Sequence, residues 1–180
     1  MAELGQNIVK TFLEEKGLVV NKILESNIKT PDFEALKNDQ LVFYCEEKTL
    51  DYDDFEGCKD DSTFNAISRH LHTAVKQFKS INPNHDVPNI LAIVNMDTLK
   101  GIHDLFTSLT GYALLDNGKY LRMHKVGHRT MDDKEHVDLY LWFDRDKFVN
   151  LIWRDDLGSE TRRKLEEIFD GYFEEDRDIT

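Results

Sequence analysis

The sequence predicts an α/β protein with a mixed, centrally parallel sheet. Segments with apolar residues at helical spacing alternate along the chain with strand-like runs; in 63–80, for example, Ile67, Leu71 and Ala74 share one helical face. The run Asn-Ile-Leu-Ala-Ile-Val at 89–94 is almost wholly apolar, as expected of a strand that is buried on both faces. The opening order of one helix, three strands, a helix and a strand therefore favours a sheet covered by helices.

Local signals mark the ends of several expected elements. Gly17 stands where a glycine would end the first helix, Ser159 suits the N-cap of the last, and Asn117-Gly118 suits a two-residue hairpin turn. No linker or repeat divides the chain, so we expect a single domain over 1–180. In chain order we expect a helix at 2–16, strands at 18–24, 32–36 and 40–48, a helix at 63–80, a strand at 89–94, a helix at 98–110, hairpin strands at 112–115 and 120–126, a strand at 136–143, and a helix at 159–173.

The composition limits the classes of partner. The formal net charge is -12 at pH 7, which disfavours loose electrostatic binding to nucleic acid or to an anionic membrane. A nucleic-acid partner therefore requires a local basic surface or the help of metal ions. The two cysteines, Cys45 and Cys58, suggest no disulfide framework, and no run approaches the roughly 20 apolar residues that a transmembrane helix needs. We expect a cytoplasmic protein with no membrane partner.

The segment Thr30–Thr49 carries the strongest chemical signal. In a strand at 40–48 side chains alternate between the two faces, so Glu46 and Lys48 point the same way. Asp32 opens the preceding strand and can supply a second carboxylate to the same place. Two carboxylates and a lysine at one point form a site for a hard divalent cation and an anionic substrate.

These residues and their order carry a family resemblance. Pro31-Asp32 followed by Glu46-Glu47-Lys48, with a helix before them and a helix and a buried strand after them, resembles the signature of the PD-(D/E)XK nuclease superfamily. The resemblance extends from the N-terminus to about Asn95. It implies a restriction-endonuclease-like core and a magnesium-dependent endonuclease or exonuclease that hydrolyses DNA in preference to RNA. Superfamily nucleases often dimerise to cut both strands, so a homodimer is among the expected states.

The resemblance also implies a role for each residue of the site. Asp32 and Glu46 would ligate Mg²⁺, or Mn²⁺ in its place, together with the backbone carbonyl of Glu47. Lys48 would orient or activate the attacking water, or stabilise charge on the phosphate. Helices at the position of 63–80 often carry a glutamine or lysine that reaches the active site, and here we expect Gln77 to do so.

One departure from the family pattern favours a second hypothesis. Many members carry an acidic residue in the first helix, where this chain has Gln6, which puts a second metal ion in doubt. The acidic segment between Asp51 and Asp61 would also repel phosphate. Both features favour a catalytically silent binding or regulatory module that keeps the nuclease fold. A third hypothesis is a coincidental fold that binds protein through exposed aromatics such as Trp142 and Trp153.

A basic segment stands out against the acidic chain. Residues 118–130 contain four Lys or Arg residues, two histidines and no acid, with Tyr120 and Met123 interleaved. We expect Arg122, Lys125 and Arg129 to contact nucleic-acid phosphates, because most backbone contacts come from Arg and Lys. The alternative is a basic hairpin that pairs with the chain's own acidic segments.

Overall fold

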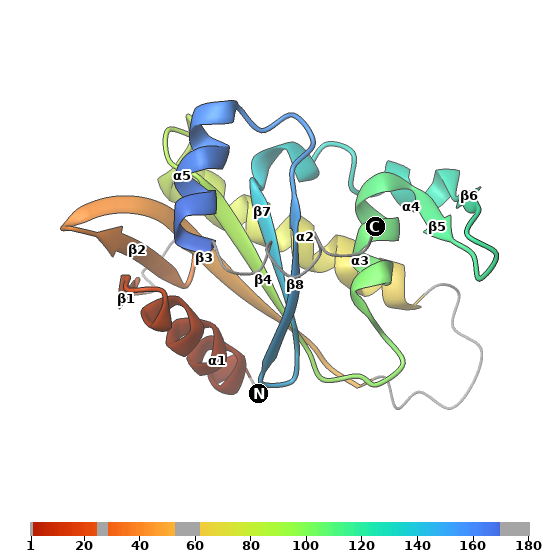
Figure 1. Cartoon of the computed structure of the whole chain (residues 1–180), viewed down its shortest axis with the longest axis horizontal. Coiled ribbons are helices and arrows are strands. Elements are labelled where there is room, and N and C mark those ends of the chain that lie inside the picture. Colours follow the sequence, from red (N-terminus) through yellow and green to blue (C-terminus); the bar gives the residue numbers. More distant parts are fainter. Residues whose placement is uncertain (1, 25–28, 53–61, 170–180) are drawn as a thin grey trace, which may run out of the picture.

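A six-stranded mixed sheet with helices on both faces forms the body of the protein (Figure 1). The computed structural model describes residues 2–24, 29–52 and 62–169. The helices are α1 (Ala2–Glu15), α2 (Ser62–Ile81), α3 (Ile102–Thr110), α4 (His124–His128) and α5 (Ser159–Phe169). The strands are β1 (Val19–Lys22), β2 (Phe33–Lys37), β3 (Gln40–Leu50), β4 (Asn89–Asn95), β5 (Tyr112–Leu114), β6 (Tyr120–Arg122), β7 (Leu139–Asp144) and β8 (Lys147–Trp153).

The centre of the sheet is parallel and its flanks are antiparallel. The strand order is β1-β2-β3-β4-β7-β8, with β3, β4 and β7 parallel to one another. Every residue of β4 is buried, as the apolar run at 89–94 predicts. The α/β class and the opening order of helix, three strands, helix and strand are confirmed.

Two layers of helices cover the sheet. Helices α1 and α5 pack against one face, where Phe43 and Cys45 of β3 join the core cluster. Helices α2 and α3 cover the other face, towards which Tyr44 points. Figure 1 shows α1 and α5 in front of the sheet and α2 behind it. Side chains of β3 therefore alternate between two different helical layers.

The hairpin differs from the expected one in its second strand. Strand β6 ends at Arg122, and the short helix α4 follows where the strand was expected to continue to Val126. The chain turns back because the backbone N–H of Met123 donates to the carbonyl of Gly111 (2.7 Å). A Cβ on Gly127 would lie only 2.9 Å from Gly111 Cα, so the backbones of α4 and the end of α3 are in close contact.

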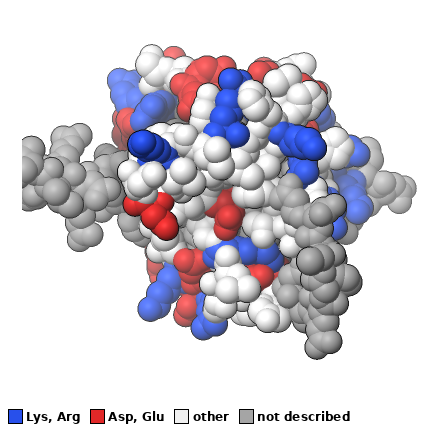
Figure 2. Space-filling model, turned by 90° about the vertical axis from the view of Figure 1, so that its right-hand side faces the viewer, with Lys and Arg blue, Asp and Glu red and all other residues white. Residues whose placement is uncertain are grey.

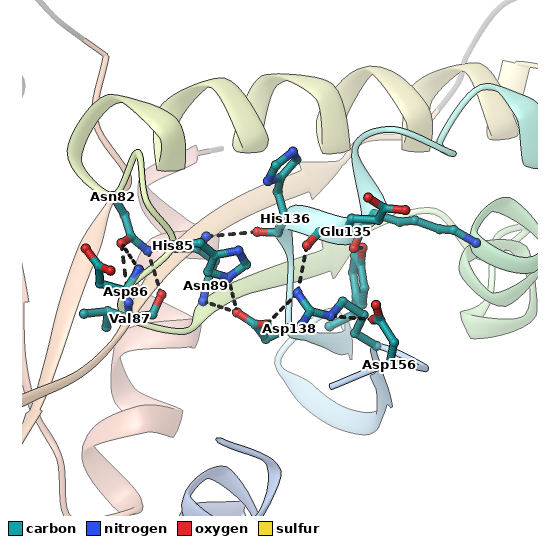
Figure 3. A network of polar contacts seen from close by, with 12 residues as sticks. Asn82, His85, Asp86, Val87, Asn89, Glu135, His136, Asp138 and Asp156 are labelled. Atoms are coloured by element: carbon teal, nitrogen blue, oxygen red, sulfur yellow. Dashed lines mark hydrogen bonds and ion pairs between the residues drawn. The ribbon is translucent and has the colours of Figure 1, made fainter. Parts of the chain in front are cut away.

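Strand β7 also begins later than expected, because 134–136 form a 3₁₀ turn and Asp138 precedes the ladder. Figure 3 shows Asp138 at the centre of a polar network at the start of β4 and β7. Its carboxylate accepts hydrogen bonds from His85 Nε2 (2.6 Å) and the Asn89 N–H (2.8 Å), and it pairs with Arg154 Nη1 (3.0 Å). The side chain thus ties the loop before β4 to the end of β8.

Some expectations concern other parts of the chain. Most of the acidic segment, from Asp53 to Asp61, and the end of the expected last helix lie outside the described residues. Within the described residues, no helix is both long enough and apolar enough to cross a bilayer.

Candidate functional site

The expected carboxylate cluster lies in a notch of the sheet, where β2 separates from β3. Pairing of these strands ends at Phe33 and Cys45, and Asp32 lies just beyond that last pair. The backbone N–H of Asp32 donates to Glu46 Oε2 (3.0 Å), and Asp32 Oδ2 accepts the backbone N–H of Glu47 (2.8 Å). Side-chain carboxylates thus replace the backbone ladder at this point. The structure brings Asp32 and Glu46 together, inside the sheet rather than at its outer edge.

Lys48 joins the cluster on the face covered by α2. Its ammonium forms an ion pair with Glu46 Oε1, which fits the period-two alternation that the sequence predicts. The Glu46 side chain is 1% exposed, whereas that of Lys48 is 17% exposed. Solvent and ligands therefore approach this pair from the side of Lys48.

Gln6 of α1 lies where the family pattern would place an acidic residue, and it contacts Asp32 directly. Its Nε2 donates to Asp32 Oδ1 (2.7 Å), while its Oε1 accepts from Lys22 Nζ (2.7 Å). A glutamate at this position would put a third carboxylate beside Asp32. The amide instead orients Asp32 without adding charge.

Glu47 points to the opposite face of β3, towards α1. Its Oε1 accepts a hydrogen bond from Thr49 Oγ1 (2.6 Å), and the residue is 4% exposed. Gly5 of α1 makes room for it, because a Cβ on Gly5 would lie 2.6 Å from Glu47 Cδ and 2.7 Å from Thr49 Oγ1. Only the backbone of Glu47 therefore faces the Asp32–Glu46 cluster.

Gln77 supports the segment that leads into the site. It is buried on α2 and donates from Nε2 to the carbonyl of Thr30 (2.9 Å). This contact fixes the chain two residues before Asp32. Gln77 thus acts on the site through the backbone of Thr30.

Burial raises the pKa of Asp32, Glu46 and Glu47, and repulsion by the charge of Asp32 adds to the rise for Glu46 and Glu47. The pKa of Asp32 is raised mainly by burial, against the lowering effect of the Glu47 N–H. Burial, followed by the charge of Asp32, raises the pKa of Glu46 to about 8. Burial also raises the pKa of Glu47 to about 7. Ionised carboxylates are costly here, and a cation between Asp32 and Glu46 would offset that cost.

The oxygen ligands available here fit a single divalent cation that prefers oxygen, such as Mg²⁺. Asp32 and Glu46 supply two carboxylates, and each of their oxygens keeps a lone pair beyond the hydrogen bond described above. Because the N–H and C=O of one strand residue point to the same side, the Glu47 carbonyl also faces Asp32. Among the described residues, no group of three or more His, Cys, Asp or Glu side chains is arranged to hold a metal ion. The set therefore depends on the Glu47 carbonyl and on water.

A pocket of about 450 Å³ opens beyond the end of β3. Arg69, His70 and Lys100 line it together with Thr49 and the first turns of α2. Burial and then the charge of Lys48 lower the pKa of His70 to about 4, so this imidazole is neutral at pH 7. No local sequence pattern predicts this pocket, because residues from β3, α2 and the loop after β4 form it together.

The basic residues lie apart from the carboxylate cluster along the fold. Arg122 ends β6, Lys125 lies in α4, and Arg129 follows that helix. In Figure 1 this region forms the end of the molecule opposite β1 and β2. Figure 2, which looks onto that end, shows several separate Lys and Arg groups with uncharged surface and some acidic groups between them.

The expectation that Trp142 is an exposed binding residue is wrong. Trp142 is fully buried, because β7 is a central strand and this side chain lies in the core between the sheet and helices α2 and α3. Its indole N–H donates to Asp144 Oδ1 (2.9 Å). Trp153 is half-buried, with the guanidinium of Arg162 over its ring at 5.4 Å.

Several residues around the site come from elements that are distant in sequence, and they could not be predicted from the sequence. Lys22, Thr49 and His70 belong to no recognisable motif. Gly5 carried the one usable signal, because a glycine inside an amphipathic helix usually has a packing reason. Comparison with protein-family models, curated proteins and solved structures found no match to this chain.

Proposed function

We propose that the chain has a restriction-endonuclease-like core and is a metal-dependent phosphodiester hydrolase that acts on DNA in preference to RNA. The observation that carries the proposal is the meeting of Asp32, Glu46 and Lys48, which are 14 and 2 residues apart in sequence, in one notch of the sheet. The carboxyls of the half-buried Asp32 and the buried Glu46 both have raised pKa values, so a bound cation would stabilise their ionised forms.

In this proposal each residue has a separate task. Asp32, Glu46 and the carbonyl of Glu47 hold Mg²⁺ or Mn²⁺, which when bound would acidify water and neutralise charge on the phosphate. Lys48 orients the attacking water or stabilises the phosphate charge. A water oxygen forms the new bond to phosphorus, the bond to one ester oxygen breaks, and that leaving oxygen takes up a proton. Gln6 and Gln77 are positioning residues.

A second candidate function is a silent binding or regulatory module with the same fold. It is favoured by the closed pattern of hydrogen bonds, in which all four oxygens of Asp32 and Glu46 already accept a donor from the protein. Gln6 in place of an acid favours it as well. Such a module would bind its partner without a cleavage step.

The deciding experiment is cleavage of a supercoiled plasmid and a single-stranded oligonucleotide under Mg²⁺ and Mn²⁺ titration. Lys48→Ala and Asp32→Asn should each lower the cleavage rate by about 100-fold or more, because each removes a group that acts in the transition state. Glu34→Gln is the matched control. Glu34 lies on β2 next to the site, and its carboxylate accepts a hydrogen bond from Asn21 Nδ2 (3.1 Å), outside the Asp32–Glu46–Lys48 cluster, so the rate should stay within about twofold.

The outcomes separate the two functions. Metal-dependent cleavage that disappears with Lys48→Ala and Asp32→Asn but survives Glu34→Gln supports the hydrolase. Cleavage that is equal in all three variants would come from a contaminant and reject it. Nucleic-acid binding without any cleavage by the wild type supports the silent module.

A further inference from the structure

The β5–β6 hairpin presents an aromatic and basic face to solvent. The two strands form a sheet of their own, outside the central sheet. Tyr112 pairs with Arg122 and Leu114 with Tyr120. Because paired residues and residues two apart point to the same side, these four side chains share one face of the hairpin.

This face is open. Tyr120 is 61% exposed, Leu114 46% and Tyr112 39%, although large apolar side chains usually cluster inside. The guanidinium of Arg122 lies 5.9 Å from the centroid of the Tyr112 ring. The arginine thus places a positive charge over an exposed ring. Two accessible rings and a guanidinium plane together form a flat surface suited to planar ligands.

The charge of the region identifies the kind of partner. Between Tyr112 and Met131 the chain carries four Lys or Arg residues and one acid, Asp116, in a protein of net charge -12. Three acids, Asp132, Asp133 and Glu135, follow directly, and Asp133 is bonded to His72 Nδ1 (3.0 Å). Basic residues therefore outnumber acids in 112–131, which gives a polyanion a locally favourable segment in an otherwise acidic protein.

We propose that the face formed by Tyr112, Leu114, Tyr120 and Arg122 binds single-stranded nucleic acid by stacking on unpaired bases. Phosphate contacts alone would not distinguish single strands from duplex. Aromatic rings do, because the bases of a duplex are already stacked on their neighbours. Lys119 in the turn and Lys125 in α4 flank the face and supply charge for the backbone of the strand. The inference takes the nucleic-acid polymer from the proposed function but does not require the carboxylate site.

Fluorescence anisotropy in EDTA tests this binding without cleavage. The probes are labelled oligonucleotides of about 20 nucleotides: oligo(dT), oligo(U) and a blunt duplex of equal length. The single strands should bind at least about tenfold more tightly than the duplex. Tyr112→Ala with Tyr120→Ala should weaken single-strand binding by about tenfold or more, since stacking contributes about 1–3 kcal/mol per base.

Matched variants separate stacking from damage to the fold. Tyr112→Phe with Tyr120→Phe keeps both rings and should bind within about twofold of the wild type. Leu121→Ala alters the opposite face of the same hairpin and should have an equally small effect. Should thermal melting show that the double alanine variant is unfolded, Tyr120→Ala alone replaces it. Its ring is largely exposed and contributes little to the core.

Three results would overturn the inference. These are equal affinity for duplex and single strand, unchanged affinity after Tyr120→Ala and the double alanine change, or no binding up to about 100 μM at low salt. Absence of nucleic-acid binding would instead favour a protein partner for the exposed face of the hairpin. Binding through the tyrosines without metal-dependent cleavage would reject the proposed hydrolase but keep the inference. Cleavage that depends on Asp32, together with binding that does not depend on the tyrosines, would support the proposed hydrolase and reject the inference.

Discussion

Gly5 shows how a single residue can be fixed by the site rather than by its helix. In an exposed helix position alanine is preferred over glycine by about 1 kcal/mol. Gly5 is buried in α1 against the Glu47 carboxyl and the Thr49 hydroxyl, which bond to each other. A methyl group there would displace a hydrogen-bonded carboxyl that has little free space.

We therefore expect Gly5→Ala to lower the free energy of unfolding by about 1–3 kcal/mol, the usual cost of overpacking. Urea denaturation of the purified protein measures this change. Gly158→Ala is the control, because a Cβ there meets no atom within 4 Å, and its stability should change by less than about 0.5 kcal/mol. A stabilised Gly5→Ala variant would show that Glu47 can move aside without loss.

At the scale of elements, Asp138 decides how the loop before β4 is held. Asp138 is 2% exposed, and its carboxylate receives donors from the loop, from β4 and from the residue that follows β8. Arg154 Nη1 also donates to the carbonyl of Glu135 (2.8 Å), and its backbone N–H donates to the carbonyl of Asp138 (3.1 Å). Figure 3 shows His85 and Asn89 in contact with Asp138.

Replacing Asp138 with alanine should destabilise the protein by about 3–5 kcal/mol, because Arg154, His85 and the Asn89 N–H would lose a buried acceptor. The midpoint of urea unfolding, with an unchanged slope, measures this loss. Asp156→Asn is the comparison. Asp156 also pairs with Arg154 (2.9 Å), but its side chain is 77% exposed, so the loss should stay below about 1 kcal/mol. Similar losses in both variants would mean that burial of Asp138 contributes little.

At the scale of the whole molecule, the buried carboxyls link stability to pH and to cations. The folded state raises the pKa of Glu46 to about 8 and that of Glu47 to about 7, so it binds these protons more tightly than the unfolded chain does. Their contribution to stability is fully present below the ordinary pKa of a glutamate, near 4.5, and is lost as pH rises through about 7 to 8.

The free energy of unfolding without metal should therefore fall between about pH 5 and pH 9, by at most about 1.4 kcal/mol per pH unit for each carboxyl. Glu46→Gln should make this fall shallower, and Glu34→Gln should leave it unchanged. Mg²⁺ should raise the melting temperature more at about pH 8.5 than at about pH 6, because only ionised carboxylates bind the metal. A Mg²⁺ effect that is independent of pH, or equal in Glu46→Gln, would contradict metal binding at this cluster.

The α/β class, the element order to β4 and the facing of β3 could all be predicted from the sequence alone. These follow from periodicity, which depends only on neighbours along the chain. The same alternation predicted that Glu46 and Lys48 share a face and that Glu47 turns away. Element boundaries were less well predicted where tertiary contacts decide them, as at α4, which exists because Gly111 and Gly127 allow two backbones to touch.

The surroundings of the carboxylates, and the exposure of other side chains, depend on tertiary contacts that the sequence does not reveal. The notch that holds Asp32 arises because β2 stops pairing with β3 at Phe33, and the partners Gln6 and Lys22 come from elements far from Glu46 in sequence. Burial of Trp142 and exposure of Tyr120 likewise depend on which strands lie at the centre of the sheet and which stand outside it. Such features arise from packing between distant segments, which no local pattern of residues records.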